Sequence, residues 1–63
     1  MDFEEGDVVR LKSGGPTMVI KEYPAKNLEG QPMTTHAECE WFDNDGILKH
    51  SIFKIIELKL TKD

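Results

Sequence analysis

The residues with the greatest capacity for chemistry in this chain are one cysteine and two histidines, Cys39, His36 and His50. A thiolate next to a histidine base can act as a nucleophile. Residues i and i+3 of a strand point to opposite faces, so His36 is badly placed to serve Cys39. His50 is expected to face Cys39 across a hairpin. A free cysteine between Ala37 and Trp41 on an apolar face is nevertheless typical of a small buried hydrophobe, so we predict a structural cysteine and no catalytic residue.

Metal and phosphate motifs lack the required spacing. One cysteine and two histidines give at most three soft ligands and no Cys-x-x-Cys pair, which is too few for zinc. A calcium loop beginning at Asp43 would need a glycine at Leu48 and an acid at Lys54. The segment 13–16 (Ser-Gly-Gly-Pro) lacks the Gly-Lys-Ser/Thr ending of a phosphate loop. We therefore expect no metal, no cofactor and no enzymatic activity.

The composition favours protein partners over nucleic acid. The chain has 63 residues, which predicts one domain over 1–63, and its formal net charge is −4 from 12 acidic and 8 basic side chains. Phosphate binding usually requires a basic patch. Nucleic-acid binding through Arg10, Lys12 and Lys21 is therefore the disfavoured alternative to solvated strand edges. With one cysteine, no apolar N-terminal segment and no membrane-spanning run, we expect a cytoplasmic location and no membrane contact.

The pattern of β-branched runs and turns predicts an all-β fold. The expected strands cover 7–11, 17–23, 36–42 and 47–51, and a short 3-10 turn over 51–54 precedes a fifth strand, with a helix as the alternative for this last segment. Gly14-Gly15-Pro16 and residues 43–46 are the predicted tight turns. Residues 24–34, with two prolines and a glycine, are expected to form a long, mobile surface loop. Together these elements suggest a small five-stranded SH3-like barrel.

The pairing of the second hairpin decides which side chains face the core. A four-residue turn over 43–46 would set Trp41 opposite Leu48 and Cys39 opposite His50. A two-residue turn would change these partners but keep the same faces. Both versions place Cys39, Trp41, Leu48, His50 and Ile52 on one face, which we expect to be the core side.

The aromatic side chains are the candidate binding residues. Trp41 is expected to anchor the core, and an exposed Trp41 with Tyr23 as recognition anchors is the alternative. Phe42 faces away from Trp41 and is predicted to be exposed, unless a partner, a second copy or the 24–34 loop covers it, or a bend at Asp43 tucks it under the rim. The candidate partner-binding residues are therefore Tyr23, Trp41, Phe42, Lys12 and Arg10.

Two separated motifs resemble the YodC-like family of small, uncharacterised bacterial and phage proteins. The first is an apolar strand with a lysine, then Gly-Gly-Pro, a methionine and a β-branched run. The second is Cys-x-Trp-aromatic-Asp, followed by a glycine turn, a phenylalanine and a leucine. The matching positions are Val9, Lys12, Gly14, Gly15, Pro16, Met18, Ile20, Cys39, Trp41, Phe42, Asp43, Gly46, Phe53 and Leu58. The 24–34 segment is longer than the family's usual connection. The resemblance implies a small cytoplasmic β-protein and lends no activity.

The function predicted from the sequence is a non-enzymatic protein-interaction module. We expect it to bind a protein partner, or a second copy of itself, through the 24–34 loop, an edge strand and exposed aromatics. A nucleic-acid-associated accessory protein and an acidic inhibitor of another protein are the alternatives.

Overall fold

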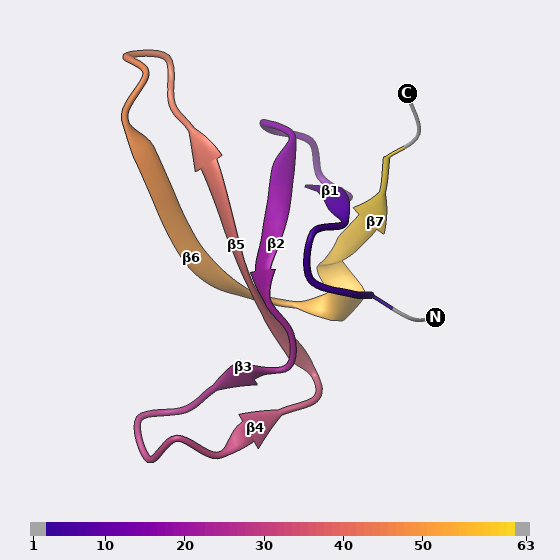
Figure 1. Ribbon diagram of the computed structural model, residues 1–63. Helices are drawn as coiled ribbons and strands as arrows, with labels where there is room; N and C mark the ends of the chain where they lie inside the picture. Colours follow the sequence, from indigo (N-terminus) through magenta and orange to yellow (C-terminus); the bar gives the residue numbers. More distant parts are fainter. Residues whose placement is uncertain (1–2, 62–63) are drawn as a thin grey trace.

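The computed structural model describes residues 3–61 as an all-β fold with one short 3-10 helix. Five strands form an antiparallel sheet in the order β6-β5-β2-β1-β7, and two short strands form a separate hairpin (Figure 1). The elements are β1 (Val8–Leu11), β2 (Met18–Glu22), β3 (Ala25–Lys26), β4 (Pro32–Met33), β5 (His36–Phe42), β6 (Leu48–Lys54), η1 (Ile55–Glu57) and β7 (Leu58–Leu60).

The five-stranded sheet is open, with β6 and β7 as its two edges. In Figure 1 the β5–β6 hairpin leans away from β1 and β7, and η1 links the two edges at the opposite end of β6. The short strand β7 has three residues, and all of them pair with β1. The main sheet therefore has the predicted five strands, but it does not close into the expected barrel.

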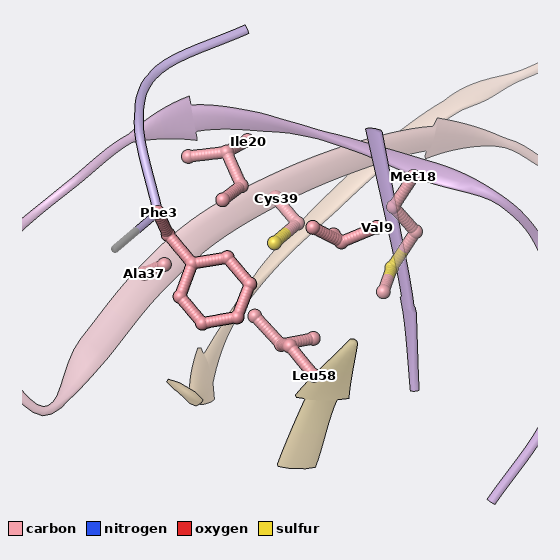
Figure 2. Close-up of a cluster of buried hydrophobic side chains, with 7 residues drawn as sticks. All are labelled: Phe3, Val9, Met18, Ile20, Ala37, Cys39 and Leu58. Carbon is pink, nitrogen blue, oxygen red and sulfur yellow. The ribbon is translucent and has the colours of Figure 1, made fainter. Parts of the chain in front are cut away.

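The core forms where strands from the two sides of the bent sheet meet. Its buried side chains come from four strands and from the segment before β1, and they are Phe3, Val9, Met18, Ile20, Ala37, Cys39 and Leu58 (Figure 2). Leu11, Tyr23, Trp41, Phe53 and Ile55 pack around this cluster and are partly buried. Such a small core gives each apolar side chain a large share of the total burial free energy. The fold therefore depends on a few residues from distant parts of the chain.

The turn between β5 and β6 is one residue longer than the predicted four. The Asp43 N–H donates to the Ile47 carbonyl at 3.0 Å, and the Gly46 N–H donates to the Asp43 carbonyl at 3.0 Å. One carboxylate oxygen of Asp43 also accepts the N–H groups of Asp45 and Ile47, each at 2.9 Å. Gly46 has φ +78°, which a glycine adopts without steric cost. The turn is therefore a five-residue unit over 43–47 with three residues in its loop.

The expected 24–34 loop instead contains a β-hairpin, with β3 and β4 as its two strands. Its turn repeats the pattern of the turn over 43–47. The Asn27 side-chain oxygen accepts the N–H groups of Glu29 (2.8 Å) and Gln31 (2.9 Å), and Gly30 has φ +81°. The Asn27 N–H donates to the Gln31 carbonyl and the Gly30 N–H donates to the Asn27 carbonyl, as the N–H groups of Asp43 and Gly46 do in the other turn. An Asp or Asn followed three positions later by Gly thus builds both hairpins, so a segment rich in Pro and Gly still forms two strands.

The C-terminal segment follows the predicted order with a shift along the chain. The short helical turn is η1 at Ile55–Glu57, four residues later than the expected 51–54, and the fifth strand of the main sheet, β7, follows it directly. β6 accordingly continues to Lys54 and is as long as β5. The length of β6 matters because this strand lies at the edge of the sheet.

Candidate partner-binding edge

The register of the β5–β6 hairpin corrects the predicted faces. Cys39 pairs with Ser51 and Trp41 with Lys49, whereas His50 pairs with Glu40. An odd number of turn residues reverses the face of every β6 side chain relative to an even number. The prediction that Leu48, His50 and Ile52 share the core face with Cys39 is therefore wrong. These three side chains lie on the outer face of the sheet.

Cys39 is a buried part of the core. Its side chain is fully buried, and its sulfur points into the cluster of Figure 2. Burial raises the pKa of the Cys39 thiol to about 11, and the nearby charge of Glu38 contributes to the same shift. A thiol that is both buried and protonated is a poor nucleophile.

Neither histidine is placed to activate the thiol. The His50 Nδ1 lies 3.0 Å from a Glu38 carboxylate oxygen on the outer face, so this ring is paired with an acid on the other side of the sheet from Cys39. The His36 Nδ1 lies 2.8 Å from the hydroxyl of Thr35. Among residues 3–61, no group of three or more His, Cys, Asp or Glu side chains is arranged to hold a metal ion.

Among residues 3–61, no strand pairs with the outer edge of β6, so its backbone groups are unpaired there. The hydrogen bonds from Asp43 N–H to the Ile47 carbonyl and from Ile55 N–H to the Thr35 carbonyl mark the two ends of the β5–β6 ladder. In an antiparallel ladder, alternate residues direct their backbone N–H and C=O toward the same neighbour. The odd-numbered residues of β6 therefore bond to β5. The even-numbered residues of β6 direct their N–H and C=O groups to the free side, and these residues are Leu48, His50, Ile52 and Lys54.

Apolar side chains stand next to this free edge on the outer face. Phe42 is 68% exposed and pairs with Leu48, which is 51% exposed. Ile52 is 43% exposed, and Val19 on β2 is 38% exposed. The prediction that Phe42 lies on the outer face is thus confirmed. Sequence reasoning missed Leu48 and Ile52 as exposed residues, because an even-numbered turn would have buried them.

Charges on and beside β6 are partly paired. The Lys49 ammonium lies 3.8 Å from an Asp43 carboxylate oxygen, and His50 contacts Glu38 as described above. These pairs are exposed and contribute little stability. They do offset the positive charge of β6, so the edge is less repulsive to another strand than its two lysines suggest.

Tyr23 and Trp41 have structural contacts in the fold. The Tyr23 hydroxyl donates to the Thr34 carbonyl at 2.8 Å and thereby ties the two ends of the β3–β4 hairpin together. Trp41 packs against the core and against Phe53, with ring centroids 6.0 Å apart and planes tilted by 51°. Both side chains are half-buried. Of the three aromatic candidates, Phe42 is the one with a largely exposed ring.

The basic candidates do not form one patch. Arg10 on β1 is exposed and lies opposite Lys59 on β7. Lys12 follows the end of β1 and lines an open surface hollow of about 490 Å³, whose lining residues are Leu11, Lys12, Ser13, Phe53, Ile56 and Glu57. Lys21 lies farther along β2, beyond the Val8–Val19 pair. The Val8–Val19 pair thus separates Arg10 from Lys21, which does not favour the alternative of a continuous basic stripe.

The family model described as Uncharacterized small protein (DUF2158) matches residues 4–58. The chain belongs to this family. Neither the search of curated proteins nor the search of solved structures found a match.

The match to the Uncharacterized small protein family includes the whole candidate edge. The matched range begins before β1 and ends at Leu58, the first residue of β7. The turns over 27–31 and 43–47 and the strands β5 and β6 therefore lie within it. Within residues 3–61, the only helix that the structure describes is the three-residue η1, and no helix there could cross a membrane.

Proposed function

We propose that this protein is a non-enzymatic protein-interaction module that receives an extended segment of another chain along the free edge of β6. The observation that carries the proposal is the seven-residue edge strand β6, whose outer backbone groups are unpaired within residues 3–61. An unpaired edge is a template for strand addition, in which the main chain supplies affinity and alternate side chains supply specificity.

The side chains beside the edge support this proposal. Leu48 and Ile52 flank the unpaired backbone on the outer face, and Phe42 extends the apolar surface onto β5. A strand added next to β6 would cover part of this surface. The burial of Cys39 and the contact between His50 and Glu38 support a non-enzymatic module.

The finer classification is also part of the proposal. The strand order, with a 3-10 turn directly before the last strand, supports an open variant of an SH3-like barrel. The motifs described above support a YodC-like member of the family. A cytoplasmic location suits a chain whose one cysteine is a free thiol.

Affinity capture from a lysate of the source cell, with and without nuclease, tests the proposal. The key variant is His50→Pro, which removes an N–H that points to the free side and leaves the bonds between β5 and β6 intact. His50→Ala is the matched control, because it loses the same contact with Glu38 but keeps the backbone donor.

We expect the native chain and His50→Ala to capture a protein that survives nuclease treatment, and His50→Pro to lose it. Capture that disappears with nuclease would favour the nucleic-acid alternative through Arg10, Lys12 and Lys21. Equal capture by His50→Pro and His50→Ala would overturn the assignment of the binding site to the β6 edge.

A further inference from the structure

We infer that the β6 edge binds a second copy of this chain, so that two β6 strands pair antiparallel and join two sheets into one. This inference rests on the proposed function and names the partner for the same edge. It is drawn from the length of β6, the direction of its backbone groups and the order of its side chains.

The two-fold axis is placed at Ser51, the middle residue of β6. With Ser51 opposite the Ser51 of the second copy, all seven residues of each strand are paired. The residues that then face each other through hydrogen bonds are His50 with Ile52 and Leu48 with Lys54. These are the four residues whose N–H and C=O groups point to the free side, so the register satisfies every unpaired group of the strand.

The side chains of β6 are complementary to themselves in this register. On the inner face Lys49 stands opposite Phe53, which allows a cation–π contact. On the outer face Leu48 lies against the aliphatic stem of Lys54, next to Phe42 of its own chain. No two like charges stand directly opposite each other, and Ser51 leaves room for close approach at the axis.

Charge does not oppose the pairing strongly. Lys49 has Asp43 within 3.8 Å and His50 has Glu38 within 3.0 Å on the same chain. The two Lys49 residues of a pair are offset by four strand positions, about 13 Å. That separation exceeds the screening length of about 8 Å at physiological ionic strength.

An alternative register with the axis at His50 is less favourable. It places two His50 side chains opposite each other, and those rings repel when protonated. It also leaves Lys54 opposite the glycine of the partner's turn, so fewer strand residues are paired. The Ser51 register is therefore the one that we assign, and cysteine cross-linking separates the two.

Sedimentation velocity over a concentration series, combined with cross-linking of introduced cysteines, tests the inference. We expect a particle of twice the 7.2 kDa chain mass that reverts to a monomer in His50→Pro but not in His50→Ala. Ser51→Cys should form an intermolecular disulfide under mild oxidation, because directly opposed Cβ atoms approach to about 4.5 Å. Lys49→Cys is the matched control two positions away on the same face, and its partner lies too far away to bridge. All cysteine variants carry Cys39→Ala so that the native thiol cannot contribute.

The outcomes are distinct, even if His50→Pro fails to fold. A monomer at every concentration, or equal cross-linking of Ser51→Cys and Lys49→Cys, overturns the inference. Selective cross-linking of His50→Cys in its place would overturn the Ser51 register. If the chain is a monomer while His50→Pro still abolishes capture from the lysate, the proposed function stands with a different protein on the same edge. If the chain dimerises but captures no other protein, the second copy is the partner.

Discussion

The reactivity of Cys39 toward a thiol reagent tests the structural role assigned to it. The folded protein and the denatured chain are treated with the same disulfide reagent, and the released chromophore is followed by absorbance. Burial raises the Cys39 pKa from 9.0 to about 11. Below pH 9 this lowers the thiolate fraction about 100-fold, since each unit is a factor of ten.

Access of the reagent slows the reaction further. Cys39 has no exposed surface, so the reagent must wait for an opening of the core. A domain of this size is stabilised by roughly 0.05–0.15 kcal/mol per residue, so open molecules are rare. We therefore expect the folded protein to react more than 100-fold more slowly than the denatured chain, with Cys39→Ser as the blank. A folded rate within tenfold of the denatured rate would refute the structural role and reopen thiol chemistry.

The same shift gives a pH dependence with a defined sign. The folded pKa lies above the unfolded one, so the unfolded chain loses the thiol proton first as the pH rises. Stability must then fall between about pH 9 and pH 11. The measured quantity is the difference between the native chain and Cys39→Ala, because contributions of all other groups cancel in that difference. Urea unfolding should show this difference shrinking toward pH 11, and a constant difference would contradict the shift.

Three further predictions concern stability and use urea unfolding at neutral pH. Leu58 is 1% exposed and Leu60 is 45% exposed on the same strand and face. Leu58→Ala should therefore cost about 2–5 kcal/mol and Leu60→Ala about 1 kcal/mol, and equal costs would contradict the described core. Asp43→Ala should lose about 1–3 kcal/mol because two backbone donors lose their acceptor, whereas the exposed neighbour Asn44→Ala should change stability by less than about 0.5 kcal/mol. Gly46→Ala should cost about 1–2 kcal/mol because its φ of +78° is strained for alanine.

Local sequence signals predicted most of the strands. Strand β5 was predicted at its observed bounds because alternating residues run unbroken from His36 to the Asp43 turn. The core positions of Cys39 and Ala37 followed from the same alternation. Strand parity also placed Phe42 on the outer face. These successes share a cause, since each depends on neighbours within one strand.

The side chains of the candidate edge were placed on the wrong face because pattern reasoning misjudged the number of residues in the turn before β6. Pattern reasoning favours an even number of turn residues, whereas the Asp43 side chain stabilises a three-residue loop that ends in Gly46. That single residue moved Leu48 and Ile52 from the expected core to the exposed face. The same spacing, an Asp or Asn followed three positions later by Gly, occurs at Asn27–Gly30 and predicts the β3–β4 hairpin. Recognising it would have replaced the long loop with two strands.

Barrel closure could not be read from the sequence because it depends on how the two edge strands meet. Strand propensity indicates that β6 and β7 are strands but does not set the bend of the sheet between them. Three residues of η1 separate the two strands, and β7 pairs with β1. The unpaired edge on which the proposed function depends is therefore a property of the tertiary arrangement.

The two matching turns also determine the order in which the chain is expected to fold. Each closes a hairpin between near neighbours in sequence, which costs little loop entropy. The β1–β7 pair, by contrast, joins opposite ends of the chain through bonds such as Thr61 N–H to the Val8 carbonyl. We expect the β5–β6 hairpin to be structured in the folding transition state and the β1–β7 contact to form afterwards. Weakening the Asp43 turn should then slow folding, whereas trimming Leu60 should mainly speed unfolding.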